Sequence, residues 1–251
     1  MRQRVNSITT SFSPQLYSLH ANENAIVVVV DVLRATSAIC TAIHHGVERM
    51  IPVASLDEAF EYKKKGYLVA AERDAVKQDG VDFGNSPFHF MTPELEGKTI
   101  AISTTNGTQA IEAAKHAHHI VIGSFLNLNS LASWLEMQNK PVVVLCAGWK
   151  NRFNLEDSLF AGALANCLIK TGKFETTCDS TIAMGHLFQL ASHDLYAFLE
   201  NSSHRKRLKN LNLEKDIRYC LQYNIMDTIP VVENGSIVRL RIHEQLSLNK
   251  A

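Results

Sequence analysis

The sequence of 251 residues contains no long apolar run, no excess of either charge and no closely spaced cysteine pair. Its longest strongly apolar run, 25–30, is far shorter than the roughly 20 residues that span a bilayer, and residues 1–20 lack the apolar segment of a secretory signal. Lys plus Arg and Asp plus Glu each total 25, which predicts no basic surface for nucleic acid or anionic lipid. We therefore expect a cytoplasmic protein with neither membrane nor nucleic-acid partners.

The contents of cysteine, proline and glycine narrow the class further. The five cysteines are odd in number and include no C-x-x-C pair, so neither a disulfide framework nor a zinc knuckle is expected. With 6 prolines, 12 glycines and 46% hydrophobic residues, the composition excludes a disordered or low-complexity chain. At about 150 residues per domain, we expect one α/β domain over 1–251, and a change of pattern near 175–180 leaves room for a subdomain boundary there.

What is present is a regular alternation of strand and helix patterns. Short β-branched runs predict strands at 25–30, 49–54, 67–71, 98–103, 119–124 and 141–146. Apolar spacing between them predicts helices at 35–46, 55–66, 106–117, 127–138 and 155–172. Most of these strands are too continuously apolar to have a wet face, which is typical of parallel strands buried on both faces. The predicted fold is therefore a three-layer α/β/α sandwich with a mostly parallel sheet.

The last third of the chain and one loop depart from this alternation. Helical segments are predicted at 182–200 and 214–223, and a β-hairpin around Asn234-Gly235 closes the chain. The stretch 73–97 is the one long irregular segment, and long loops in compact domains are usually functional or mobile. This loop is a candidate cover for a site.

Ligands of parallel sheets bind beyond the carboxyl ends of the strands, so polar residues at those ends are candidates for a site. Such residues follow four of the predicted strands: Asp31, Arg34, Thr36, Glu72, Arg73, Thr104, Thr105, Asn106, Gly107, Thr108, Cys146, Arg152, Glu156 and Asp157. Both signs of charge are therefore expected to converge on one edge of the sheet.

The segment 104–108, TTNGT, joins a buried strand to a helix. Such a junction offers backbone N–H groups and the positive end of the helix dipole to an anion, and Gly107 would allow close approach. The plainer interpretation is that Thr105 or Asn106 caps the helix. Arginines at neighbouring strand ends favour the anion site, because guanidinium groups match phosphate or sulfonate oxygens in fork geometry.

Four carboxylates are expected at the same edge: Asp31, Glu72, Glu156 and Asp157. Hard oxygen ligands beside a phosphate site are the usual way in which proteins hold Mg²⁺, so these four are the candidate metal ligands. The plainer role for Glu156 and Asp157 is to complement the start of a helix. Asp31 closes a run of four valines, so it must be hydrogen-bonded, paired or metal-bound.

Two phosphatase mechanisms can be compared with these residues. An aspartyl-nucleophile hydrolase of the haloacid dehalogenase type needs a second Asp two residues after Asp31, where this chain has Leu33. Cys146 and Arg152 have the C-x₅-R spacing of cysteine-dependent phosphatases, but Phe153 follows the arginine where those enzymes usually carry Ser or Thr. The candidate catalytic residues are Asp31, Arg34, Cys146 and Arg152. The nucleophile is left open among Asp31, Cys146 and a water molecule.

The strand-end motifs together resemble the family of Mg²⁺-dependent 2-phosphosulfolactate phosphatases. The likeness rests on DVLRATS (31–37), AERD (71–74), FGNSP (83–87), STTNGT (103–108), CAG (146–148) and FNLEDSLFAGAL (153–164), which occur in this order. A weaker likeness continues through SSHRKRL (202–208), where the family often has a glycine near the position of Lys206. The basic run at 204–207 could attract an anionic substrate, although such runs are more often simply solvated.

The resemblance implies a Mg²⁺-dependent hydrolysis of 2-phospho-3-sulfolactate to 3-sulfolactate and phosphate, a step of coenzyme M synthesis. Substrate anions would then be bound by Thr36, Arg73, Asn85, Ser86 and the segment 104–108. Another small phosphorylated acid is an open alternative, because a fold family does not determine the substrate. The expected partner is thus a small anionic phosphorylated substrate, and a homodimer is left open.

A protein that binds an anionic metabolite without catalysis is the alternative from a different class. The carboxylates expected beside the anion site disfavour it, since a pure anion binder gains nothing from repelling its ligand. The enzyme hypothesis requires Asp31 and Asn106 to face the same pocket.

Overall fold

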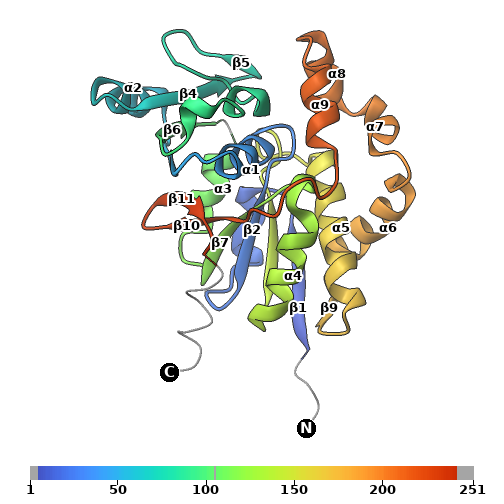
Figure 1. Ribbon diagram of the computed structural model, residues 1–251. Helices are drawn as coiled ribbons and strands as arrows, with labels where there is room; N and C mark the ends of the chain where they lie inside the picture. The colour runs from blue at the N-terminus through green and yellow to red at the C-terminus, as the bar shows by residue number, and fades with distance from the viewer. Residues whose placement is uncertain (1–4, 105, 242–251) are drawn as a thin grey trace.

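The computed structural model describes residues 5–104 and 106–241 (Figure 1). Within these residues one sheet of eleven strands has the order β5-β4-β6-β3-β11-β10-β7-β2-β8-β1-β9. The strands are β1 (Asn6–Ser11), β2 (Ile26–Val30), β3 (Arg49–Pro52), β4 (Leu68–Arg73), β5 (Val76–Lys77), β6 (Thr99–Ser103), β7 (His119–Gly123), β8 (Val142–Cys146), β9 (Phe174–Glu175), β10 (Pro230–Glu233) and β11 (Ser236–Arg239).

The α-helices of the described residues are α1 (Ala35–His44), α2 (Leu56–Lys64), α3 (Gly107–Ala113), α4 (Leu128–Gln138), α5 (Leu155–Lys170), α6 (Asp179–Ala191), α7 (Leu195–Phe198), α8 (Ser203–Asn210) and α9 (Glu214–Cys220). Short 3₁₀ helices lie between them, namely η1 (Pro14–Leu19), η2 (Pro87–Phe90), η3 (Pro93–Leu95), η4 (Phe125–Asn127) and η5 (Leu199–Asn201). Among the described helices, none is long and apolar enough to cross a membrane.

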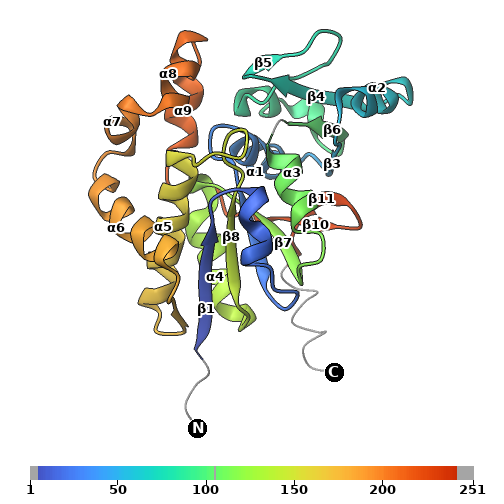
Figure 2. The same cartoon turned by 180° about the vertical axis from the view of Figure 1, so that it is seen from behind.

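The central strands are buried on both faces. Along β2, Ile26, Val28 and Val30 belong to one hydrophobic core, whereas Val27 and Val29 belong to the core on the other side. Helices α4 and α5 cover the first face (Figure 1), and α1 and α3 contribute to the core of the second, where Figure 2 shows α3 in front of the sheet. The three-layer α/β/α fold predicted from the continuous apolar runs is thus confirmed.

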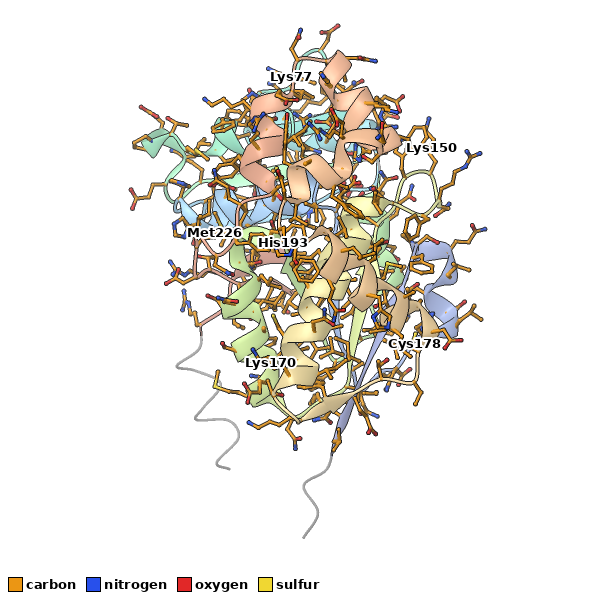
Figure 3. The ribbon with its side chains drawn as sticks, turned by 90° about the vertical axis from the view of Figure 1, so that its right-hand side faces the viewer. Lys77, Lys150, Lys170, Cys178, His193 and Met226 are labelled. Atoms are coloured by element: carbon orange, nitrogen blue, oxygen red, sulfur yellow. The ribbon has the colours of Figure 1, made fainter. Side chains whose placement is uncertain are left out.

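The sheet has two groups of parallel strands, and the carboxyl ends of both groups meet at one end of the molecule, where Arg34 after β2 pairs with Glu72 on β4. β2 pairs in parallel with β7 and β8, and β6 pairs in parallel with β3 and β4. In Figure 3, Lys77 on β5 and Lys150 after β8 lie toward this end, and Lys170 at the end of α5 lies toward the other. All six predicted strands are present, whereas β1 was not anticipated.

The C-terminal hairpin, which was predicted from Asn234-Gly235, is confirmed. Both turn residues have positive φ, 50° and 74°, as a two-residue type I′ turn requires. The hairpin does not lie at an edge of the sheet. β10 pairs antiparallel with β7, and β11 pairs antiparallel with β3, so the hairpin joins the two parallel parts of the sheet.

The segment predicted as helical at 182–200 consists of separate helices. α6 ends at Ala191, and α7 starts after Asp194, whose Oδ1 accepts a hydrogen bond from the backbone N–H of Ala197 at 2.9 Å. An Asp at this N-cap position satisfies a backbone donor of the new helix. α6, α7, α8 and α9 then rise beside α5 toward the carboxyl ends of the parallel strands (Figure 1).

The central position of the hairpin leads to a prediction about the free energy of unfolding. Ile237 on β11 is 0% exposed and pairs with Met50. Replacing Ile237 with Ala should lower the free energy of unfolding by about 2–5 kcal/mol, because a cavity opens in the middle of the sheet. Urea denaturation checks this value. Ile182→Ala, at a position 42% exposed on α6, is the matched control and should change stability by less than about 0.5 kcal/mol.

Candidate active site

A small cavity of about 30 Å³ lies at the carboxyl ends of the parallel strands. Its lining residues are Asp31, Leu33, Arg34, Ala35, Glu72, Asp74, Ala75, Asn85, Thr104, Asn106, Trp149, His204 and Arg207. Asp31 and Asn106 face the same cavity, so the expectation on which the enzyme hypothesis depends is confirmed. The 73–97 loop also reaches it, through Asp74, Ala75 and Asn85.

Asp31 follows β2 and is only 6% exposed. The turn into α1 holds it, because its backbone N–H donates to Thr36 Oγ1 at 3.1 Å and its carboxylate accepts from the Ala35 N–H. Gly107 packs beside it, and a Cβ at Gly107 would lie 3.6 Å from Asp31 Oδ2 and 3.1 Å from Thr104 Oγ1. The absence of a side chain at Gly107 therefore keeps space beside this carboxylate.

Burial is the main cause that raises the pKa of Asp31 to about 6, and the negative charges of Glu72 and Glu156 act in the same direction. His204 acts in the opposite direction. No ion pair to Asp31 is formed by the residues in the described ranges. Asp31 is thus a buried acid whose charge is incompletely balanced by the protein.

Arg34, by contrast, is balanced by two carboxylates. Its guanidinium group donates to Glu72 Oε2 and, at 2.5 Å, to Asp216 Oδ2 on α9. Ser86 Oγ donates to the other oxygen of Asp216 at 3.1 Å. The guanidinium group of Arg34 therefore forms an ion-pair bridge between β4 and α9, and Ser86 supports that bridge.

A second cavity of about 330 Å³ adjoins the first and shares Trp149, His204 and Arg207 with it. Its other lining residues are Arg152, Phe153, Asn154, Leu155, Glu156, Ser202 and Ser203. Glu156 is fully buried and forms a short hydrogen bond through Oε1 to His204 Nδ1. The predicted residues Glu156 and Arg152 therefore belong to this second cavity.

Asp157 has a different environment from the other predicted metal ligands. Its Oδ1 accepts the backbone N–H of Val32 at 2.8 Å, and its Oδ2 accepts that of Gly148 at 3.1 Å. Burial raises its pKa well above the usual value, as do the charges of Asp31 and Glu156. Because both oxygens hold backbone groups, this arrangement favours a structural role for Asp157, joining the loops after β2 and β8, over metal binding.

Two other predicted residues, Arg73 and Thr108, do not line the small cavity but bond to the segments that do. Arg73 donates to Ser103 Oγ at 2.9 Å and so joins the ends of β4 and β6. Thr108 donates its backbone N–H to Thr104 Oγ1 at 3.2 Å, at the start of α3. Thr105 lies outside the described residues.

Cys146 is fully buried at the end of β8 and lines neither cavity. Burial raises the pKa of its thiol well above the usual value, and the charges of Asp157 and Glu156 act in the same direction. A thiol in this environment stays protonated and shielded, which disfavours it as a nucleophile.

Helix α8, which carries His204 and Arg207, is fixed by a stack around Tyr196. The guanidinium carbons of Arg205 and Arg218 lie 3.7 and 3.8 Å from the centre of the Tyr196 ring. Glu214 Oε1 lies within 3.9 Å of Arg205 and 3.6 Å of Arg218. These contacts hold α8 against α7 and α9 and so position the wall shared by the two cavities.

Buried polar atoms without a hydrogen-bond partner are concentrated in this region. In the described ranges they are Arg34 Nε, Asn85 Oδ1, Glu156 Oε2 and Arg207 Nε at the two cavities, and Ser13 Oγ and Glu214 Oε2 elsewhere. Unsatisfied buried groups are uncommon and call for a ligand, ion or water as an explanation. The acceptors suit a cation, and the guanidinium donors suit an anion.

The protein groups at the small cavity fit an Mg²⁺ ion that takes most of its ligands from water and substrate oxygens. Within the described residues, no three His, Cys, Asp or Glu side chains are grouped so that they could hold a metal ion. Mg²⁺ is usually bound by one or two carboxylates, with waters and substrate phosphate completing its shell. Asp31 and the unpartnered Asn85 Oδ1, which both line the small cavity, meet that requirement.

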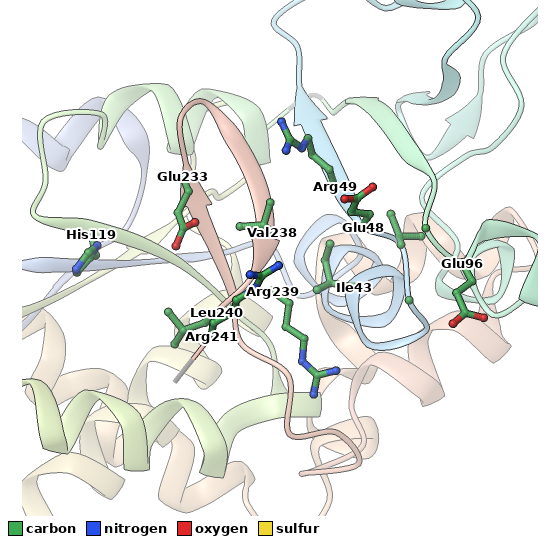
Figure 4. A pocket seen from close by; sticks show the side chains of 13 residues that line it. Ile43, Glu48, Arg49, Glu96, His119, Glu233, Val238, Arg239, Leu240 and Arg241 are labelled. Atoms are coloured by element: carbon green, nitrogen blue, oxygen red, sulfur yellow. The ribbon is translucent and has the colours of Figure 1, made fainter. Parts of the chain in front are cut away.

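A wider cavity of about 890 Å³ lies elsewhere in the molecule (Figure 4). Glu48 and Arg49 at the start of β3 and His119 at the start of β7 line it, together with Arg239 of β11. It therefore lies at the amino ends of the parallel strands, whereas ligands of such sheets bind at the carboxyl ends. The smaller pair of cavities is the better candidate for the active site.

Three lining residues of the shared wall were not predicted as site residues. Trp149 belongs to none of the motifs from which the site was predicted, and His204 and Arg207 belong to the basic run at 204–207. Within that run, the helical period places His204 and Arg207, which are three residues apart, on the side of the cavities. Lys206 is exposed. This spacing was the available signal.

Buried acids and guanidinium groups at the carboxyl ends of parallel strands define an α/β enzyme site for an anionic substrate. The sequence profile of the 2-phosphosulpholactate phosphatase family matches residues 11–235. The chain belongs to this family and is a phosphoric monoester hydrolase, as the resemblance of its motifs implied.

Relatives from several bacteria agree with this assignment. A protein of Thermotoga petrophila is 39% identical over 211 residues, which are 84% of this chain and 90% of the relative. Relatives from Caldanaerobacter subterraneus and Clostridium acetobutylicum are 36% and 34% identical, cover 84% and 86% of this chain, and are matched over 89% and 93% of their own lengths. All three are named probable 2-phosphosulfolactate phosphatase.

The contacts of Asp157 predict a loss of stability on its replacement. Asp157→Ala leaves the N–H groups of Val32 and Gly148 buried without acceptors, at a cost of about 1–3 kcal/mol for each. Urea denaturation should therefore show a loss of about 2–6 kcal/mol. Glu112→Ala, which removes an exposed ion pair on α3, is the control and should cost less than about 1 kcal/mol. An Asp157→Ala protein of wild-type stability would contradict this role.

Replacement of Asp31 should raise the free energy of unfolding, in contrast to replacement of Asp157. The fold raises its pKa to about 6 from 3.8, so its ionised form opposes folding above that pH. In chelator at pH 8, Asp31→Asn should therefore unfold with a free energy about 1–3 kcal/mol higher than wild type. The difference should shrink as the pH falls toward 4, because the wild-type acid is then protonated in the folded state. Phosphatase activity should be abolished at every pH.

Proposed function

We propose that this protein hydrolyses 2-phospho-3-sulfolactate to 3-sulfolactate and phosphate in a Mg²⁺-dependent reaction. Support comes from the family and from the names of its relatives. The observation that carries the proposal is the buried Asp31 carboxylate, which has no ion-pair partner among the described residues, in a cavity that Arg207 also lines. Such a site stabilises a dianionic phosphoryl group only together with a cation.

Asp31 and Asn85 are the residues that would hold Mg²⁺ in the small cavity. When bound there, Mg²⁺ would neutralise part of the charge that develops on the phosphoryl oxygens. The chain itself supplies orientation, because Thr36 and Ala35 fix the Asp31 backbone and carboxylate. Either Asp31 or a water molecule beside it attacks phosphorus, and both schemes need the carboxylate in this position.

His204 is suited to transfer the proton that the departing hydroxyl group of sulfolactate needs. Glu156 Oε1 bonds to its Nδ1, which orients the ring and leaves Nε2 as the second nitrogen. His204 lines both cavities, so it lies between the phosphoryl end and the rest of the substrate. In this scheme a proton moves from His204 Nε2 to the ester oxygen as the P–O bond breaks.

No contact in the described residues favours a cysteine nucleophile, because the Cys146 thiol is buried outside both cavities. The site also disfavours a non-catalytic metabolite binder, since the oriented His204–Glu156 pair supplies groups that simple binding does not need.

Phosphate release from purified protein tests the proposal. We expect the highest kcat/KM for 2-phospho-3-sulfolactate, a lower value for 2-phospholactate, and a loss of about a hundredfold or more when EDTA removes Mg²⁺. Cys146→Ser should keep the wild-type rate. Turnover that is insensitive to chelator would contradict the role of Mg²⁺, and release of no phosphate from any monoester would favour the non-catalytic binder.

A further inference from the structure

The arginines near the site differ in whether their guanidinium groups are already bonded to other groups of the protein. Arg34 is paired with Glu72 and Asp216, and Arg73 is bonded to Ser103. In the described part of the chain, neither Arg152 nor Arg207 forms an ion pair with a carboxylate. These two guanidinium groups are therefore the ones that a substrate anion can engage without breaking a pair within the protein.

Arg207 is held in one orientation before any ligand binds. Its guanidinium carbon lies 4.1 Å from the centre of the Trp149 ring, so the group stacks on the indole. Trp149 lies in a turn closed by backbone hydrogen bonds of 3.1 and 3.0 Å with Arg152, and the Lys150 N–H bonds to Asn106 Oδ1 at 3.3 Å. The turn is thus fixed to the start of α3, and Arg207 is fixed to the turn.

The two cavities differ in charge. The small cavity contains three acids, Asp31, Glu72 and Asp74, against the guanidinium groups of Arg34 and Arg207. Its excess of acids suits a metal ion and the phosphoryl group that it accompanies. The larger cavity contains Arg152 and Arg207, with polar groups from Asn154, Ser202 and Ser203. Its one acid, Glu156, is bonded to His204. The larger cavity is therefore the one suited to a second anion.

We propose that Arg207, together with Arg152, forms a subsite that binds a second acidic group of the substrate, a carboxylate or a sulfonate. This inference rests on the proposed function, because it takes the phosphoryl group to be in the small cavity. Arg207 lines both cavities, so the acid must be close to the phosphate ester in the same molecule. The substrate class is then small phosphorylated hydroxy acids, and phosphomonoesters without an acid are poor substrates.

Paired substrates test the subsite by kinetics. 2-Phospho-3-sulfolactate and isopropyl phosphate are both esters of secondary alcohols, but only the first carries additional acids. Arg207→Gln should lower kcat/KM for the first by about ten- to hundredfold, mainly through KM, because charge-assisted hydrogen bonds are lost. Its kcat/KM for isopropyl phosphate should fall by a clearly smaller factor, because that ester carries no second acid. Lys206→Gln removes the same charge from the exposed side of α8 and should change neither value.

Binding of the product 3-sulfolactate provides a test that does not depend on turnover. The chain has two tryptophans, and Trp134 is buried on α4, away from both cavities. In a Trp134→Phe background, 3-sulfolactate should change the fluorescence of Trp149 in a saturable way. Adding Arg207→Gln should raise the Kd by about ten- to hundredfold, whereas Lys206→Gln should leave it unchanged.

The outcomes separate this inference from the proposed function. Wild-type affinity for 3-sulfolactate in Arg207→Gln would overturn the subsite, even if phosphatase activity is present. Equal losses of kcat/KM on both phosphate esters would also overturn it, because Arg207 would then act on the phosphoryl group. If the protein binds 3-sulfolactate through Arg207 but releases no phosphate, the subsite stands and the proposed function fails. Arg207→Lys, which keeps the charge but loses the fork, should give an intermediate Kd if Arg207→Gln does not fold.

Discussion

The buried guanidinium group of Arg34 is the contact on which the arrangement of the site depends. It joins Glu72 at the end of β4 to Asp216 on α9, two segments that lie on opposite sides of the end of the sheet (Figure 1). Loss of one partner from a buried ion pair costs about 3–5 kcal/mol, because the remaining charge stays buried. The bridge therefore sets the separation between the β4 wall and the C-terminal helices, and the small cavity lies between these walls.

The same bridge decides which acids remain for chemistry. Glu72 and Asp216 balance Arg34, Asp157 holds two backbone N–H groups, and Glu156 is bonded to His204. Asp31 is left as the acid with the least compensation, and its raised pKa reflects that. Proteins keep such uncompensated charges where a ligand completes the balance, since they reduce the stability of the fold alone.

Much of the fold and part of the site could be predicted from the sequence. Continuous valine-rich runs identify buried parallel strands, and the residues that follow them identify the edge where Asp31 and Asn106 meet. The partner of each side chain could not be predicted. Asp157 and Arg34 both lie where a helix begins after a strand, but Asp157 accepts hydrogen bonds from two backbone N–H groups, whereas Arg34 pairs with two carboxylates. These partners depend on where distant segments pack, and neither the path of α9 nor the wall formed by α8 follows from local periodicity.

The place of the β10–β11 hairpin also depends on long-range packing, and it has a consequence for synthesis of the chain. The strands on its two sides, β7 and β3, are made long before the hairpin, yet they have no shared partner until residues 230–239 leave the ribosome. Until then, each half of the sheet presents an unpaired edge of the kind that promotes aggregation. This chain should therefore depend on chaperones until its final strands are available, and its folding should be largely post-translational.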